Sequence, residues 1–209
     1  MQKHLVLLGD SIFDNGTYVD GPNAVRDHLA RIIPEWQITL IAVDGHTTRD
    51  IPDQATHIPA SATHLALSVG GNDALNVIPR LRTEAQDVLH ALKVLADIRD
   101  DFTTNYQRAL SAVSGRQLPL IVCTIYDQIP GLTKELQTAL APFNEFILKE
   151  SVVRKLSVLD LRCVCTEPED YSDKSPIEPS SQGGKKIAGA LSKIIEQRGC
   201  IENICSIYS

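Results

Sequence analysis

The sequence has few of the features that mark membrane, zinc or nucleic-acid-binding proteins. It contains no run of eighteen consecutive apolar residues, and the first predicted strand begins too close to the N-terminus for a signal peptide. The five cysteines are odd in number and form no C-x-x-C pair, which favours reduced thiols and no zinc site. The net charge of -6 provides no basic face for nucleic acid. We therefore expect a soluble, cytoplasmic protein.

Glycine-rich phosphate-binding loops are also missing. Neither G-x-x-x-x-G-K-[ST] nor G-x-G-x-x-G follows the first predicted strand, so the sequence does not favour a nucleotide site. Nothing else in the sequence indicates a metal or an organic cofactor, and we expect none.

Apolar, β-branched runs separated by helical patterns predict one α/β domain over residues 1–209. The runs cover residues 5–8, 38–43, 65–69, 120–125 and 158–161. Because they are almost continuously apolar, they should be buried on both faces, which favours a parallel sheet in a three-layer α/β/α sandwich. Helices are expected over residues 23–33, 84–98, 102–114, 132–150 and 182–197, and Gly199 is expected to stop the last one.

Polar residues and glycines follow three of the predicted strands. Ser11 comes after the first strand, Gly45 after the second and Asn72 after the third. Ligands of open parallel sheets bind beyond the carboxyl ends of the strands, so these residues should lie along one edge. Acyl transfer needs a nucleophilic oxygen and rigid donors for the tetrahedral oxyanion. The Ser11 hydroxyl, the Gly45 N–H and the Asn72 amide would meet that need.

Three motifs occur in order, each after a predicted strand: Gly9-Asp10-Ser11, Asp44-Gly45-His46-Thr47-Thr48 and Gly70-Gly71-Asn72-Asp73. A fourth, PSSQGGKKIA at residues 179–188, leads into the last predicted helix. Taken singly, each motif is better explained as a turn. Taken together and in order, they resemble those of the SGNH/GDSL hydrolase family of GDSL-like lipases and acylhydrolases.

The resemblance covers the whole chain and carries implications for fold and activity. It implies a flavodoxin-like, five-stranded parallel sheet in the order 2-1-3-4-5 and the hydrolysis of esters or thioesters. It further implies that Ser11 is the nucleophile and that the Ser11 N–H, the Gly45 N–H and the Asn72 amide form the oxyanion hole.

The chain departs from the family at the base of the catalytic triad. The usual D-x-x-H-P motif is replaced by Ser175-Pro176-Ile177-Glu178-Pro179, and no histidine occurs in the last 119 residues. Our first hypothesis is that Glu178 takes the proton of Ser11. Its ordinary pKa lies roughly 2 units below that of histidine, so burial would have to raise it. Ser175 would avoid the repulsion of an aspartate and could hydrogen-bond Glu178.

Two other hypotheses stay open. The base could be His46, oriented by Asp50 or Asp14, although residues of this family motif often only line the pocket. Alternatively, the protein could be a binding or sensing module that has lost most turnover, with Glu178 interacting with the positive end of the last helix.

We favour a serine esterase or acyl-hydrolase that acts on small carboxylic esters or thioesters, with Ser11, Gly45, Asn72 and Glu178 as catalytic residues. The expected partner is a small-molecule ester, with neither nucleic acid nor a membrane. Aromatic residues are scarce, with 4 Phe, 1 Trp and 5 Tyr. This scarcity favours short acyl groups.

Overall fold

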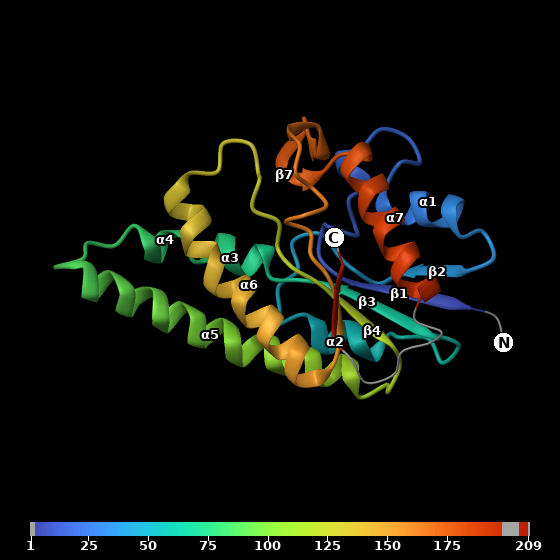
Figure 1. Ribbon diagram of the computed structural model, residues 1–209, viewed down its shortest axis with the longest axis horizontal. Coiled ribbons are helices and arrows are strands. Elements are labelled where there is room, and N and C mark those ends of the chain that lie inside the picture. The colour runs from blue at the N-terminus through green and yellow to red at the C-terminus, as the bar shows by residue number, and fades with distance from the viewer. Residues whose placement is uncertain (1–2, 198–204, 209) are drawn as a thin grey trace.

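A computed structural model describes residues 3–197 and 205–208 and contains a six-stranded parallel sheet (Figure 1). The strand order is β2-β1-β3-β4-β5-β8. The strands are β1 (His4–Gly9), β2 (Gln37–Leu40), β3 (His64–Ser68), β4 (Leu120–Cys123), β5 (Ser157–Leu159) and β8 (Ser206–Tyr208). The α/β class, the parallel sheet and the order 2-1-3-4-5 are confirmed. The expected total of five strands is wrong, because β8 pairs with the outer side of β5.

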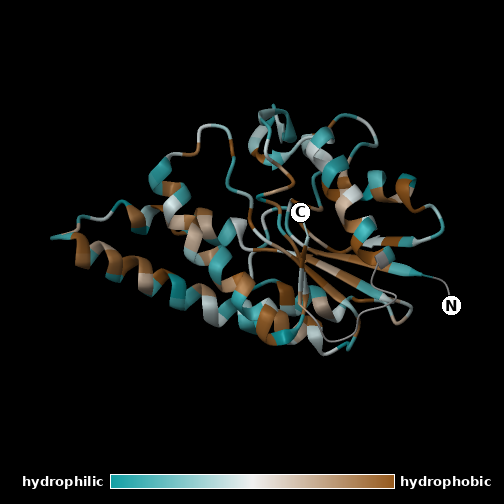
Figure 2. Cartoon of the chain, viewed as in Figure 1, coloured by the Kyte–Doolittle hydropathy of each residue, from teal (hydrophilic) through white to brown (hydrophobic). Residues whose placement is uncertain are grey.

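Helices cover both faces of the sheet (Figure 1). One face carries α1 (Val25–Ile32) and α7 (Ser181–Gln197), and the other carries α2 (Ile51–Thr56), α5 (Val88–Ser114) and α6 (Lys134–Arg154). Two short helices, α3 (Gly71–Asn76) and α4 (Ile78–Leu81), follow β3. Alternate residues of β1 enter opposite cores, with Leu5 and Leu7 on one side and Val6 and Leu8 on the other. The hydrophobic colour of the strands in Figure 2 reflects this burial on both faces.

Helix α5 is a single helix of 27 residues, so the two separate helices expected over residues 84–98 and 102–114 are wrong. Ile98, Phe102 and Tyr106 are buried at intervals of four residues and form one continuous stripe through the expected break. The charged residues 99–101 face outward and contain no glycine or proline that would interrupt the helix. The expected end of the last helix at Gly199 lies outside the described residues. No described helix is long and apolar enough to cross a membrane.

A small antiparallel hairpin brings the C-terminal third of the chain to the carboxyl edge of the sheet. It consists of β6 (Tyr171–Ser172) and β7 (Ser175–Pro179), and two short 3-10 helices, η1 (Gly16–Tyr18) and η2 (Pro168–Asp170), lie near it. The Ser172 hydroxyl donates to the carbonyl oxygen of Tyr18. This contact fastens the hairpin to the loop that follows β1.

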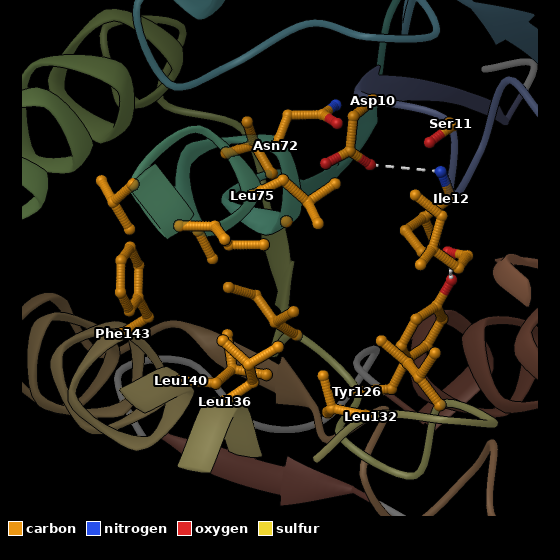
Figure 3. A pocket seen from close by; sticks show the side chains of 18 of the residues that line it. Asp10, Ser11, Ile12, Asn72, Leu75, Tyr126, Leu132, Leu136, Leu140 and Phe143 are labelled. Carbon is orange, nitrogen blue, oxygen red and sulfur yellow. Dashed lines mark hydrogen bonds between the residues drawn. The ribbon is translucent and has the colours of Figure 1, made fainter. Parts of the chain in front are cut away.

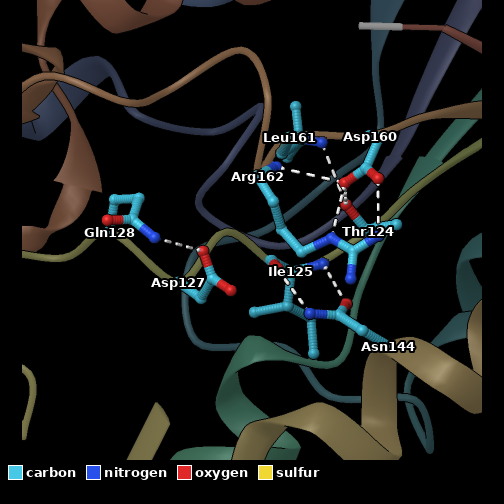
Figure 4. Close-up of polar contacts among 8 residues, drawn as sticks. All are labelled: Thr124, Ile125, Asp127, Gln128, Asn144, Asp160, Leu161 and Arg162. Atoms are coloured by element: carbon cyan, nitrogen blue, oxygen red, sulfur yellow. Dashed lines mark hydrogen bonds and ion pairs between the residues drawn. The ribbon is translucent and has the colours of Figure 1, made fainter. Parts of the chain in front are cut away.

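Polar side chains fix the ends of β4 and β5 (Figure 4). The Thr124 hydroxyl donates to Asp160 Oδ1 at 2.8 Å, and Asp160 also forms an ion pair with Arg162. Asn144 of α6 binds the backbone of Ile125 twice, accepting from its N–H and donating to its carbonyl oxygen, each at 2.8 Å. The segment that leaves β4 is therefore held against α6.

Candidate active site

Ser11 follows β1 at a point where β1 and β3 approach each other closely. Gly9 has a φ of +123°, and a Cβ placed there would lie 1.7 Å from the carbonyl oxygen of its partner Ser68. Gln54 of α2 binds Gly9 from the other side, accepting from its N–H and donating to its carbonyl oxygen, both at 2.8 Å. The backbone that leads into Ser11 is thus fixed on two sides.

The loop after β2 and the helix after β3 are joined by side-chain hydrogen bonds. Asp73 accepts from the Thr48 N–H at 2.9 Å and from the Thr48 hydroxyl at 2.6 Å. The Asn72 amide donates to the carbonyl oxygen of His46 at 2.9 Å. One hydrogen of that amide remains available, because an Asn side chain carries two.

Backbone N–H groups near Ser11 are available as well. Within residues 3–197 and 205–208, neither the Ser11 N–H nor the Gly45 N–H donates a hydrogen bond to another residue. Gly45 is exposed and has a φ of +82°, in the left-handed region. Ser11, Asn72 and Glu178 line one pocket, whereas Gly45 is not among the residues that line it.

Two hydrogen bonds hold the backbone on either side of Glu178. The Tyr126 hydroxyl donates to the carbonyl oxygen of Ile177 at 2.5 Å. The Asn15 amide donates to the carbonyl oxygen of Pro179 at 3.1 Å, while its oxygen accepts from the Val25 N–H at 3.0 Å. Since Asn15 lies in the loop that follows Ser11, it connects this loop directly to β7.

Glu178 is a buried carboxyl, with 5% of its surface exposed. Burial raises the pKa of Glu178 to about 7. A hydrogen bond from the Ser11 hydroxyl lowers this pKa, and the negative charge of Asp44 raises it. The Oε2 atom of Glu178 is buried and has no hydrogen-bond partner among the described residues. Burial therefore favours the protonated form of this carboxyl more than is usual for a glutamate.

A buried carboxyl, Asp10, and a half-buried one, Asp73, lie close to Glu178. Burial raises the pKa of Asp10 to about 8, the Ile12 N–H opposes the rise, and the charges of Glu178 and Asp73 add to it. Burial also raises the pKa of Asp73, although its hydrogen bonds from Thr48 act in the opposite direction. Asp10 and Glu178 line the same pocket, and burial raises the pKa of both, so the site holds less negative charge than its three carboxyls suggest.

His46 is engaged in other contacts. Its Nδ1 lies 2.9 Å from the Gln54 amide nitrogen, which makes Nδ1 an acceptor and places the proton of the neutral ring on Nε2. Asp50 accepts from Thr47 instead, and Asp14 accepts from the Asp44 N–H. The orientation of His46 by either carboxylate is therefore not observed among the described residues.

Ser175 likewise makes no hydrogen bond to Glu178 in the described part of the chain. The two residues lie three positions apart on β7, and side chains at odd spacing along a strand point to opposite faces. The expected contact between them is not found among the described residues.

An apolar pocket extends from Ser11 and passes between α3–α4 and α6 (Figure 3). Its polar lining residues gather near Ser11 and include Asp10, Asn72 and Glu178. The rest of the wall is mainly aliphatic and includes Leu75, Ile78, Leu81, Leu132, Leu136 and Leu140, with Phe143 across the pocket from Ser11. The scarcity of aromatic residues therefore does not limit the apolar surface of this pocket.

The sequence did not identify this pocket or the residues that support the site. Leu136 and Leu140 have the spacing of an ordinary core-facing helix, and Gln54 and Asn15 carry no motif that would identify their backbone partners. Among the described residues, no group of three or more His, Cys, Asp or Glu side chains could hold a metal ion.

Comparisons with known structures find the same fold in lipases. An extracellular lipase from Streptomyces rimosus superposes with a TM-score of 0.69 at 16% identity, over 91% of this chain and 99% of that one. A phospholipase A1 from Streptomyces albidoflavus gives 0.70 at 16% identity, over 92% and 99%. A lipolytic G-D-S-L family protein from Veillonella parvula gives 0.71 at 15% identity, over 93% and 99%.

The family comparison covers most of the chain. No curated protein matches the sequence. The model of the GDSL-like lipase/acylhydrolase family matches residues 7–186, a range that includes Ser11, Asn72 and Glu178. The resemblance seen in the sequence motifs is confirmed, and the chain belongs to the GDSL-like lipase/acylhydrolase family.

Proposed function

We propose that the protein is a serine ester hydrolase in which a glutamate replaces the histidine of the usual triad. The activity is the hydrolysis of small carboxylic esters or thioesters through an acyl-serine intermediate. The observation that carries the proposal is that Ser11 and Glu178 line the same pocket and that Glu178 is a buried carboxyl whose pKa is raised to about 7. A base works best when its pKa lies near the working pH.

Burial offsets the disadvantage of a carboxylate as a base. The ordinary pKa of histidine is about 6.5, and the pKa of Glu178 is about 7. Ionised Glu178 accepts the proton of Ser11 while the serine oxygen attacks the carbonyl carbon of the ester. A second carboxylate to orient the base is not needed, because the contacts of Tyr126 and Asn15 already fix the backbone around Glu178.

The tetrahedral intermediate carries a negative oxygen that needs donors. The Ser11 N–H, the Gly45 N–H and the second hydrogen of the Asn72 amide have the required chemistry, and none donates to another described residue. Removing one such donor typically costs a factor of about 100 to 1,000 in rate. Protonated Glu178 then gives its proton to the leaving alcohol or thiol, and the acyl-serine forms.

Water completes the cycle. Glu178, ionised again, takes a proton from a water molecule that attacks the acyl-serine, and it returns this proton to the serine oxygen as the ester bond to Ser11 breaks and the acid leaves. Because Glu178 acts as the base in both acylation and deacylation, its protonation at low pH should slow both steps.

The test is turnover of p-nitrophenyl acetate and p-nitrophenyl butyrate by the wild-type protein and by Ser11→Ala. We expect hydrolysis by the wild type, its loss in Ser11→Ala and a mass increase of one acyl group on Ser11 after rapid acid quench. A folded wild-type protein that hydrolyses neither ester and forms no adduct would instead identify a binding or sensing module.

A further inference from the structure

A second cavity, with a volume of about 280 Å³, lies against a different face of the α3–α4 segment from the apolar pocket. The lining residues of this segment recur at intervals of three or four, as on one face of a helix: Asp73, Asn76, Val77 and Arg80. The loop after β2 and the helices α5 and α6, which lie beside α3 and α4 in Figure 1, complete the wall. Ser11, Asn72 and Glu178 do not line this cavity. It is therefore a separate site from the one at Ser11.

The wall of this second cavity offers hydrogen-bond donors and acceptors that the protein does not use. Arg49, in the loop after β2, is exposed, and its guanidinium has no hydrogen bond or ion pair with another described residue. The Asn76 side chain likewise has no partner in the described part of the chain. The Asn105 amide donates to the carbonyl oxygen of Asp101 at 3.0 Å, which leaves its side-chain oxygen and one hydrogen unused. Donors and acceptors are thus available together.

The charges of this wall cancel. Two arginines and two aspartates line the cavity, and Arg80 pairs with Asp101 at 2.8 Å. Both oxygens of Asp73 already accept from Thr48. An anion in the cavity would meet the two carboxylates, and a cation would meet the two guanidinium groups. The lining therefore favours a neutral occupant that both donates and accepts hydrogen bonds.

The base of the second cavity is apolar. Ile98, Phe102 and Phe143 line it and are buried, and the two phenylalanine rings pack with centroids 4.6 Å apart. A sugar ring matches this combination, because each hydroxyl both donates and accepts while the C–H groups of the ring form an apolar face. The cavity is slightly smaller than the range of about 300 to 1,000 Å³ that is typical for drug-sized ligands. Its size therefore suits one sugar ring better than a chain of several.

We propose that this cavity binds a single neutral sugar unit, one hexose or pentose ring, at a site separate from Ser11. Arg49 and Asn76 donate to hydroxyl oxygens of the sugar, and the side-chain oxygen of Asn105 accepts from a hydroxyl. The C–H face of the ring lies toward Phe102. This inference goes beyond the hydrolase function proposed above and does not depend on it.

The test is titration of the isotope-labelled protein with D-glucose, D-galactose, D-mannose and D-xylose, followed by NMR. For at least one sugar we expect saturable shifts of signals from residues 47–49 and 76–80, with a Kd of roughly 1 to 10 mM. Cyclohexanol, a ring of similar size with one hydroxyl, should bind at least tenfold more weakly, because it leaves most of the polar groups unpaired. Sodium phosphate should not displace the sugar. No saturable shift with any of the sugars, equal binding of cyclohexanol, or displacement by phosphate would overturn the inference.

Two substitutions locate the sugar in the cavity. Arg49→Ala should weaken its binding at least tenfold and Asn76→Ala roughly fivefold, since hydrogen bonds from a charged donor are the stronger ones. Arg99→Ala is the matched control, because Arg99 is exposed on α5, pairs with Asp100 and does not line the cavity; its affinity should equal that of the wild type. Equal affinities in the wild type, Arg49→Ala and Asn76→Ala would overturn the assignment. The spectrum of each variant shows whether it folds, and the two cavity variants substitute for each other if one does not.

Ser11→Ala separates this inference from the hydrolase function. We expect this variant to bind the sugar with the affinity of the wild type. If no ester were hydrolysed but the sugar still bound in this way, the hydrolase function would fail and the sugar site would stand. Loss of sugar binding in the folded Ser11→Ala variant would place the sugar at Ser11 and overturn the inference of a separate site.

Discussion

Replacing Glu178 with glutamine should make the protein more stable at alkaline pH and far less active. Burial raises the pKa of Glu178 from its ordinary 4.5 to about 7. This difference corresponds to about 3 kcal/mol, since one pKa unit is worth about 1.36 kcal/mol. The folded state holds the proton more tightly than the unfolded state, so this carboxyl reduces the free energy of unfolding as the pH rises from about 4.5 to about 7.

Glutamine is an uncharged isostere of protonated glutamate, so the penalty should vanish in the variant. At pH 4 the two proteins should have similar free energies of unfolding, and at pH 8 Glu178→Gln should be more stable by up to about 3 kcal/mol. Urea denaturation at both values measures this difference. Over the same range, kcat for p-nitrophenyl butyrate should fall by about 100- to 10,000-fold, because a positioned base contributes a factor of this size.

The combination of results separates a base from a structural residue. If Glu178 had only a structural role, its replacement by glutamine would lower the free energy of unfolding of the protein at every pH. Stability curves of the two proteins that run parallel from pH 4 to pH 8 would refute the buried, raised pKa. Unchanged kcat in a folded Glu178→Gln protein would refute its role as the base.

Three other substitutions test neighbouring parts of the site. Gly9→Ala should destabilise the fold by more than about 4 kcal/mol in urea denaturation, because its Cβ would lie 1.7 Å from the Ser68 carbonyl oxygen; near-wild-type stability would contradict the close approach of β1 and β3. Asn72→Ala should lower kcat for p-nitrophenyl butyrate by about 100- to 1,000-fold with a smaller change in KM, as expected for an oxyanion donor; an effect on KM alone would indicate substrate binding instead. Asp10→Asn should gain stability relative to the wild type as the pH rises from 5 to 9, because burial raises the pKa of Asp10 to about 8. A variant whose free energy of unfolding fell relative to that of the wild type over this range would contradict the burial of this carboxyl.

Most of the fold was predictable because it depends on strong local patterns. Apolar β-branched runs identified five strands, and their burial on both faces follows from the absence of alternating polar residues. Strand β8 is only Ser206-Ile207-Tyr208, too short to show such a pattern, and it forms because the outer edge of β5 is open to pairing. Helix α5 continues through residues 99–101, where the prediction places a break, because Ile98, Phe102 and Tyr106 form one buried stripe across this charged stretch.

Candidate site residues could be predicted from the sequence where they directly follow a predicted strand. Ser11 and Asn72 were identified in this way, and Glu178 was identified because it occupies the place of a missing histidine; the structure brings all three to one pocket. The supporting contacts of Asn15 and Gln54 were not predictable, because each joins segments far apart in the chain through one side-chain amide. Nor does a sequence state how far a carboxyl is buried, and burial is what sets the pKa of Glu178.

The rate at which a fluorophosphonate labels Ser11, followed by intact mass and peptide mapping from pH 5 to pH 9, measures proton transfer from the serine most directly. We predict a single adduct on Ser11 whose rate of formation rises with a midpoint near pH 7, as the pKa of Glu178 requires, and a rate in Glu178→Gln that is at least 100-fold lower and lacks this midpoint. Labelling of another residue, or a rate that is the same in both proteins at every pH, would contradict a Ser11–Glu178 dyad.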